Sequence, residues 1–172
     1  MQQKQLRSDL VSILPKLRRY AVALCRHTSD ADDLVQSAIV QALTYDESAL
    51  AAERLDIWMY RIIKNLWLNH QRRPSVRNPH QVVDNLFDMV GENGCDLTEA
   101  RSSLALAHRV FGQMNPEMRE TAVLVMVNQL TYQQAATILN TPIGTVMSRV
   151  ARARIILTEA LSGVSERKVR VL

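Results

Sequence analysis

Residues that interrupt helices are scarce in this chain of 172 residues, which contains five glycines and five prolines. An average chain of this length has about 20 residues of these two types. So few turn-forming residues indicate long elements, hence helices. Aromatic residues make up 5% of the chain, which argues against a β-sandwich or a β-barrel, while an apolar content of 47% excludes full disorder. The sequence therefore predicts an all-α fold.

Cysteine is also rare, with Cys25 and Cys95 the two in the sequence. Two thiols do not make a disulfide framework, and the lack of a CxxC pair argues against a zinc site of the cysteine type. We expect two reduced thiols, no metal and no other cofactor.

Motifs of common enzyme classes are missing as well. The sequence has no HExxH helix, no glycine-rich phosphate loop and no GxSxG elbow. Its histidines are scattered along the chain, at His27, His70, His80 and His108. We therefore expect a protein that is not an enzyme and has no small-molecule substrate.

Long apolar runs are absent too. No run approaches the roughly 18 residues of a membrane span. The first residues, MQQKQLRSDL, lack the apolar stretch of a secretory signal. We expect a cytoplasmic protein that is not inserted in a membrane.

The net charge of +4 conceals alternating blocks of opposite sign. Such blocks indicate separate surfaces for separate partners, with the basic ones available for phosphate. The alternative is that each block is only a solvated helix face. The blocks and their charges are residues 1–26 (+5), 27–53 (−6), 54–80 (+5), 81–100 (−5), 101–140 (+1) and 141–172 (+4).

Helical periodicity and the position of the acids divide the chain into two domains. Apolar stripes predict helices over residues 8–27, 31–43 and 54–72, with a loop over 44–53. Acids, prolines and glycines gather in the middle of the chain. We expect two small helical domains, residues 1–73 and 98–172, joined by a flexible acidic linker over residues 74–97.

The segment from Thr131 to Arg154, TYQQAATILNTPIGTVMSRVARAR, has the strongest pattern. Thr131 is placed to cap a short helix, and Asn140 to close it in the left-handed conformation. Thr141-Pro142 is again a cap followed by a first-turn proline. The second helix has a predicted core face of Ile143, Val146, Val150, Ala153 and Leu157. Its other face is polar and cationic, as in a recognition helix of a helix-turn-helix.

This segment resembles region 4, the carboxy-terminal DNA-binding region, of extracytoplasmic-function (ECF) sigma factors of bacterial RNA polymerase. Its Tyr-x-x-x-Ala-x-x-Leu and Pro-x-Gly-Thr-Val-x-Ser-Arg stretches both match. The first half is similar to region 2 of that family, through DADDLVQ at residues 30–36 and through WMYRI followed by Lys64-Asn65. The resemblance extends over about residues 8–73 and 98–160. It implies a region 2 bundle of three to four helices and a region 4 helix-turn-helix domain.

By this resemblance, the acidic helix that starts near Asp30 docks on the clamp helices of the largest subunit of core polymerase. Acids in a first helical turn are suited to meet arginines of a partner. For Asp32 and Asp33, the alternative role is to stabilise the positive end of the helix dipole. The implied contact residues are Asp30, Asp32, Asp33 and Gln36.

The resemblance further implies that the helix ending near Arg73 reads and melts the minus-ten element of the promoter. Melting requires that unstacked bases of one strand are held. Trp67 either stacks on a base or packs as a core side chain, whereas Trp58 matches a core position. The implied minus-ten residues are Arg61, Lys64, Asn65, Trp67, Asn69, Arg72 and Arg73.

The recognition helix is expected in the major groove of the minus-thirty-five element. Met147 stands where many relatives have a cation, which favours contact with a thymine methyl group. The implied contact residues are Thr141, Gly144, Thr145, Met147, Ser148, Arg149 and Arg152.

The predicted function is therefore that of an alternative sigma factor that binds core RNA polymerase and promoter DNA, responds to stress or another signal, and is held by an anti-sigma factor. Two alternatives belong to other classes. One is a sigma-like mimic that titrates an anti-sigma factor, and such a mimic has no use for Arg149, Arg152 and Arg154. The other is a stand-alone helix-turn-helix regulator, which leaves the region 2 pattern unexplained.

Overall fold

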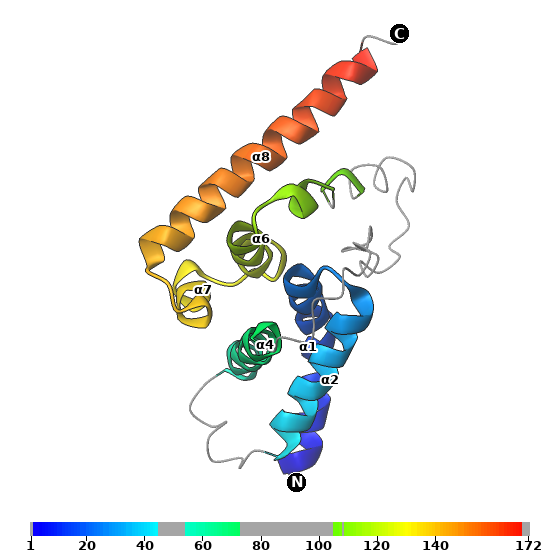
Figure 1. Ribbon diagram of the computed structural model, residues 1–172, viewed down its shortest axis with the longest axis vertical. Coiled ribbons are helices and arrows are strands. Elements are labelled where there is room, and N and C mark those ends of the chain that lie inside the picture. Colours follow the sequence, from blue (N-terminus) through cyan, green and yellow to red (C-terminus); the bar gives the residue numbers. More distant parts are fainter. Residues whose placement is uncertain (1, 45–53, 73–104, 108, 170–172) are drawn as a thin grey trace.

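The computed structural model describes residues 2–44, 54–72, 105–107 and 109–169, and all regular elements in these ranges are helices (Figure 1). The predicted all-α fold is confirmed. The linker at 74–97 and most of the loop at 44–53 lie outside the described residues, as do Arg73 and Cys95.

The helices form two bundles. The amino-terminal bundle consists of α1 (Gln2–Cys25), α2 (Thr28–Thr44) and α4 (Leu55–Gln71). Residues 105–107 and 109–113 are also helical. The carboxy-terminal bundle consists of α6 (Pro116–Ala122), the π-helical η1 (Val123–Val127), α7 (Tyr132–Leu139) and α8 (Ile143–Val169).

The core of the amino-terminal bundle lies where its three helices meet. α1 continues through Pro15 without interruption, and it buries Leu17 and Tyr20 completely. α2 presents small side chains such as Ala31 and Ala38 at this core, which allows the helices to approach closely. α4 buries Met59 and Ile63, among others.

Local capping chemistry shapes the carboxy-terminal bundle. The predicted cap at Thr141 is wrong, because α8 begins at Ile143 and the Thr141 hydroxyl donates to the carbonyl of Leu139. The Asn115 side chain accepts a hydrogen bond from the backbone N–H of Met118 at the start of α6. Thr131 and Gln134 form a capping box at the start of α7. Asn140 ends α7 with φ 49°, in the left-handed region. The N–H of Thr141 then bonds to the carbonyl of Ala136 over 3.1 Å, as in a Schellman motif.

α8 packs one face on the bundle and extends beyond it (Figure 1). Val146, Val150 and Ala153 are completely buried, as predicted, and Leu157 packs half-buried against them. The prediction is wrong for Ile143, which is 43% exposed. Ile143 is the first residue of α8, next to the turn, and the buried stripe begins one turn later.

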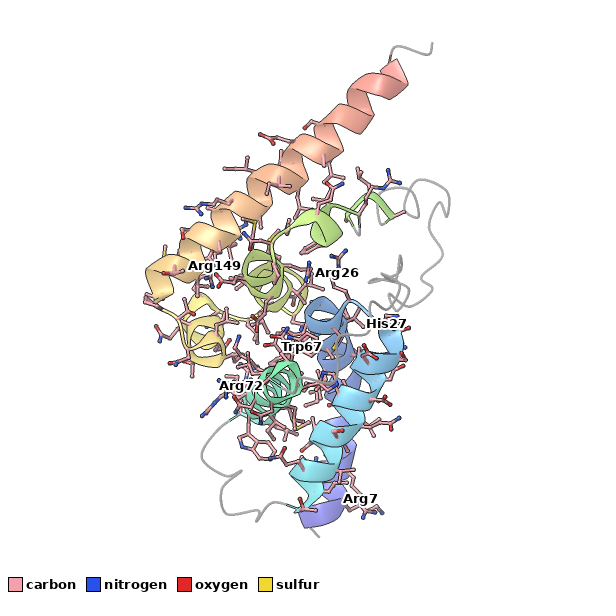
Figure 2. All side chains as sticks on the ribbon, in the orientation of Figure 1. Arg7, Arg26, His27, Trp67, Arg72 and Arg149 are labelled. Atoms are coloured by element: carbon pink, nitrogen blue, oxygen red, sulfur yellow. The ribbon has the colours of Figure 1, made fainter. Side chains whose placement is uncertain are left out.

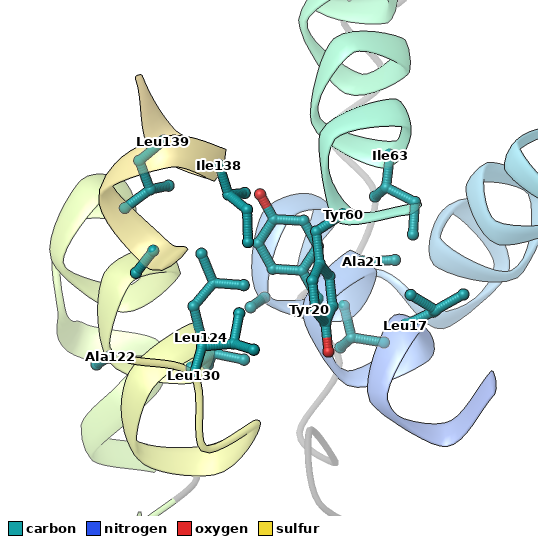
Figure 3. Packing of buried hydrophobic residues seen from close by; sticks show 14 of the residues in the cluster. Leu17, Tyr20, Ala21, Tyr60, Ile63, Ala122, Leu124, Leu130, Ile138 and Leu139 are labelled. Atoms are coloured by element: carbon teal, nitrogen blue, oxygen red, sulfur yellow. The ribbon is translucent and has the colours of Figure 1, made fainter. Parts of the chain in front are cut away.

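The two bundles also pack against each other. α1 contacts α6 and η1, and α4 contacts α7. Buried apolar residues from both bundles belong to one cluster, in which Tyr20 and Tyr60 lie between Leu17 and Ile63 on one side and Leu124 and Ile138 on the other (Figure 3). No helix in the described ranges is long and apolar enough to cross a membrane.

Candidate functional site

The outer surface of α2 carries the acidic residues that the sequence singles out. Asp32 forms a bidentate ion pair with Arg18 of α1, with 2.9 Å between Arg18 Nη2 and Asp32 Oδ2. The same pair raises the pKa of the Arg18 guanidinium. Asp33 and Gln36 are exposed, and Asp30 is half-buried. Asp32 therefore joins α1 to α2, whereas Asp33 and Gln36 face outward.

A shallow groove follows these outward residues along α2. It is lined by Asp33, Gln36, Ser37, Val40, Gln41 and Thr44. Val40 is 63% exposed, an unusual value for a valine in the middle of a helix, and Leu43 is also exposed. Apolar side chains beside acids suit a protein partner better than they suit the anionic backbone of a nucleic acid.

α4 divides the predicted minus-ten residues between two faces. Arg61, Asn65 and Arg72 are exposed and, at spacings of four and seven residues, share one face. Trp67, labelled in Figure 2, is half-buried. It stacks on His70, with 5.9 Å between the ring centroids. Trp67 also lines a pocket with Asp30 and Asp33 of α2. The acids in that pocket repel the phosphates of DNA. The position of Trp67 beside them therefore favours a packing role for this side chain over stacking on a base.

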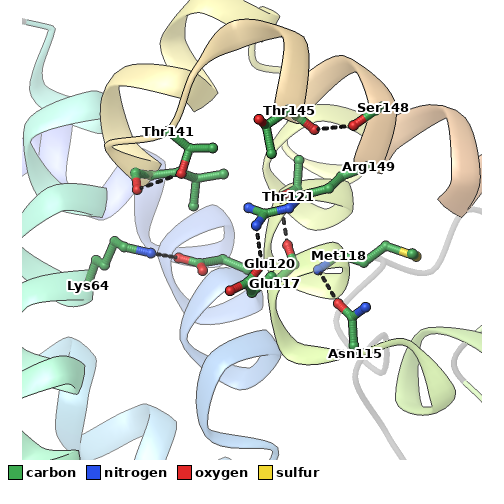
Figure 4. Close-up of polar contacts among 11 residues, drawn as sticks. Lys64, Asn115, Glu117, Met118, Glu120, Thr121, Thr141, Thr145, Ser148 and Arg149 are labelled. Carbon is green, nitrogen blue, oxygen red and sulfur yellow. Dashed lines mark hydrogen bonds and ion pairs between the residues drawn. The ribbon is translucent and has the colours of Figure 1, made fainter.

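The remaining minus-ten residues of the described chain differ in exposure. Asn69 is exposed at the rim of the same pocket. Lys64 is turned toward the carboxy-terminal bundle, where its Nζ lies 2.7 Å from Oε1 of Glu120 (Figure 4). The ammonium is therefore already neutralised in this arrangement.

The start of α8 displays the predicted minus-thirty-five residues. Gly144, Met147, Ser148 and Arg152 are exposed, and Met147 reaches 50% exposure. A Cβ atom added at Gly144 would meet no other atom within 4 Å, so packing inside the protein does not require glycine there. The absence of a side chain leaves room for close approach of a ligand from outside.

Hydrogen bonds and an ion pair hold the other predicted residues of this segment (Figure 4). The Thr141 hydroxyl donates to the carbonyl of Leu139 over 3.2 Å, and Ser148 donates to the carbonyl of Thr145 over 2.9 Å. Arg149 pairs with Glu117 at the start of α6. The Glu117 side chain is 72% exposed, so the pair lies at the surface. A surface ion pair contributes little free energy, so Arg149 can leave Glu117 for another anion at small cost.

Several polar residues that lie between the bundles are absent from the sequence-based predictions. Glu120 accepts hydrogen bonds from Tyr20 (2.6 Å) and Lys64. Arg119 donates to the carbonyl of Ala23 over 2.8 Å, and its burial lowers the pKa of the guanidinium.

Asn128, at the end of η1, donates to the carbonyl of Lys16 (3.1 Å) and accepts from Arg19. The N–H of Asn128 bonds to the carbonyl of Val123, five residues earlier, as in a π-helix. The sequence does contain a signal for these buried polar groups. The charged Arg119 and Glu120 follow Met118 and precede a mainly apolar stretch that ends at Val127.

The described ranges hold no group of three or more histidines, cysteines or acids placed to bind an ion. The described surfaces include an acidic and apolar face of α2, a basic face of α4 and the exposed start of α8, the second helix of the helix-turn-helix. Such surfaces bind macromolecules.

Two family models match the chain, in the order that the two bundles have along it. Residues 10–64 match the Sigma2 domain of PhyR, and residues 104–157 match region 4 of Sigma-70. The chain is 30% identical to the ECF RNA polymerase sigma factor EcfG of Rhodopseudomonas palustris over 153 residues, which are 87% of this chain and 81% of the relative. It is 29% identical to the ECF RNA polymerase sigma-E factor of Escherichia coli K12, over 74% of this chain and 71% of the relative.

Solved structures agree. The sigma factor RpoE of Bartonella quintana, in complex with the anti-sigma factor NepR, superposes with a TM-score of 0.74 at 25% identity, over 92% of this chain and 98% of that chain. CnrH, in complex with the cytosolic domain of CnrY, shares the fold with a TM-score of 0.61 at 22% identity, over 94% and 90% of the two chains. With both regions matched in order and the relatives covered over most of their length, the chain belongs to the ECF sigma factors, the alternative sigma factors that direct RNA polymerase to promoters.

Proposed function

We propose that the two bundles divide the work of promoter recognition. The amino-terminal domain, residues 1–73, binds core polymerase through α2 and opens the minus-ten element with α4. The carboxy-terminal domain, residues 98–172, reads the minus-thirty-five element. Residues 74–97 connect them.

The observation that carries this proposal is the two-sided start of α8. Val146 and Val150 are completely buried in the bundle, which holds the helix rigidly. The opposite side exposes Met147, Ser148 and Arg152. A rigid helix with a cationic, polar and outward-facing first segment fits the major groove. Arg152 is the residue of this face best suited to bind a guanine or a phosphate. It is exposed, and it forms no ion pair with another residue that the structure describes.

Polymerase binding is assigned to the exposed part of α2. Asp33, Gln36 and Val40 combine charge, an amide and an apolar side chain along one groove. Because Asp32 is paired with Arg18, we assign it a role in joining α1 to α2 in addition to any contact with polymerase.

We also infer that an anti-sigma factor holds this protein inactive. The RpoE structure that superposes over 92% of this chain is a complex with such a factor. A sigma-like mimic would share this partner without binding DNA, but the exposed Met147 and Arg152 favour a protein that binds the promoter.

The test is transcription in vitro with core polymerase, on promoters found by sequencing the transcripts that this protein initiates. Arg152→Ala is expected to weaken promoter binding about tenfold, the loss of one base contact of roughly 1–3 kcal/mol, with core polymerase still bound. Asp33→Lys is expected to abolish co-purification with core polymerase.

Matched controls are available on the same helix. Arg154→Ala removes an exposed arginine that lies about 200° around α8 from Arg152. Glu159→Lys reverses the charge of an exposed acid that lies on α8 and not on α2. Both are expected to behave as the unchanged protein. If the unchanged protein initiates at no promoter of its host, the proposed function is wrong. Equal footprints of the two arginine variants would remove Arg152 from the recognition surface.

A further inference from the structure

The contact between the two bundles contains an unusual number of polar groups. Arg119, Glu120 and Asn128 of the carboxy-terminal bundle are 4%, 8% and 2% exposed, and all three bond to the amino-terminal bundle. Each bundle has a mainly apolar interior of its own. Apolar side chains of both bundles also meet in this contact. Buried polar groups among them are more typical of a transient interface than of a permanent one.

Glu120 is at the centre of this contact. Its Oε1 atom accepts from the Tyr20 hydroxyl of α1 at 2.6 Å and from the Lys64 ammonium of α4 at 2.7 Å. The two donors come from different helices of the same bundle, so one carboxylate ties both of them to α6. Figure 4 shows the bond from Lys64. A buried carboxylate is costly without partners, and both of these partners belong to the opposite bundle.

The same contact includes one unsatisfied group. The hydroxyl of Tyr60 is buried without a hydrogen-bond partner in the part of the chain that the structure describes. Tyr60 is completely buried and packs edge-to-face on Tyr20, with 5.2 Å between the ring centroids. A buried hydroxyl without a partner disfavours the packed arrangement, and separation of the bundles would let water reach it.

Lys64 links this contact to promoter binding. While its ammonium is paired with Glu120, it is unavailable to a phosphate of the minus-ten strand. The two pairings exclude each other, because the ammonium lies in a site where its side chain is 18% exposed. In contrast, Asp33 and Gln36 of α2 are exposed while the bundles are packed together.

We propose that Glu120 is an electrostatic clasp that holds the bundles closed and withholds Lys64 from the promoter, while the polymerase-binding face of α2 stays accessible. This inference rests on the proposed minus-ten role of Lys64. Opening transfers Lys64 from Glu120 to a DNA phosphate and hydrates both Glu120 and Tyr60.

The first measurement is energy transfer between dyes on the two bundles. The dyes are placed at Val11→Cys in α1 and Ile155→Cys in α8, both exposed, in a chain with Cys25→Ser and Cys95→Ser. Glu120→Gln and Lys64→Met each remove the ion pair and are expected to lower the transfer efficiency. Glu117→Gln removes an exposed acid of the same helix, whose partner Arg149 lies in the same bundle, and is expected to leave it unchanged.

The second measurement is the salt dependence of binding to a single-stranded minus-ten oligonucleotide. Each additional phosphate contact on a single strand steepens the slope of log K against log salt by about 0.7. Glu120→Gln is expected to gain one such contact, because Lys64 is released. Lys64→Met opens the bundles equally but is expected to gain none.

The outcomes separate the clasp from the proposed function. Transfer that stays at the parent value in both Glu120→Gln and Lys64→Met overturns the clasp, even if transcription is normal. Lower transfer without any binding of DNA supports the clasp and contradicts the minus-ten role of Lys64. If Glu120→Gln does not fold, as judged by circular dichroism, Lys64→Met and Tyr20→Phe decide the first measurement.

Discussion

Individual charged side chains in this protein behave according to their burial. Arg18, Arg19 and Arg119 are all used in contacts between helices, at Asp32, Asn128 and the carbonyl of Ala23 respectively. Part of the basic block at the start of the chain therefore serves the fold. Exposed residues such as Asp33 and Arg152 remain for partners.

The thiol of Cys25 illustrates the effect of burial on one group. Burial, and then the charge of Asp30, raise its pKa to about 12. Because the thiolate is the reactive form, we expect Cys25 to react with Ellman's reagent at pH 8 at least about tenfold more slowly than in the unfolded chain. The measurement uses a Cys95→Ser variant, with the same protein in guanidinium chloride as control. Equal rates in both conditions would show that Cys25 is accessible and ordinary.

The helix-turn-helix depends on backbone geometry at a few positions between its elements. Asn140 has φ 49°, and the hydrogen bonds that follow it direct the chain from α7 into α8. Since α8 carries the exposed residues that we propose for promoter recognition, the angle between the two helices determines where those residues point.

Asn140→Ala is expected to lower the free energy of unfolding by about 1 kcal/mol. The reason is that alanine, unlike asparagine and glycine, is strained in the left-handed region. Asn140→Gly is expected to cost little or nothing, since glycine adopts this conformation readily. Urea unfolding checks both, with Thr137→Ala, an exposed position within α7, as the control. A loss as large in Asn140→Gly as in Asn140→Ala would mean that the asparagine side chain, and not the backbone, closes the helix.

The two bundles behave as one packed molecule because buried groups of each find partners in the other. Tyr20 and Tyr60 lie within this contact (Figure 3). Burial, followed by the charge of Glu120, raises the pKa of Tyr20 well above 10, and burial, followed by the charge of Asp56, raises the pKa of Tyr60.

These raised pKa values make the packed molecule sensitive to alkali. Above about pH 10 the unfolded chain loses phenolic protons that the folded chain retains, so the stabilisation present below that pH is lost as the pH rises. We expect the unfolding free energy to fall between pH 9.5 and about 11 in a Cys25→Ser background, which removes the thiol from the titration. Tyr20→Phe is expected to reduce this fall. A free energy that is constant over the range would contradict the buried state of both phenols.

The sequence predicts those parts of the structure that depend on neighbours along the chain. Thr131 caps α7 and Asn140 closes it, where their types and positions predict it. The stripe from Val146 to Ala153 is buried because residues three and four apart share a helix face. Ile143 departs from that stripe because a periodic pattern does not show where the packed part of a helix begins.

By itself, the sequence determined the helices, both ends of α7, the order of the two regions and the family, because these depend on local hydrogen bonding and on matched residue patterns. Only the tertiary structure decided which candidate residues are free. Lys64 and Glu120 are 56 residues apart, and Trp67 and Asp33 line one pocket from two different helices. No spacing along the chain shows these arrangements. The physical reason is that pairing and desolvation depend on distances in space, which the packing of the two bundles sets.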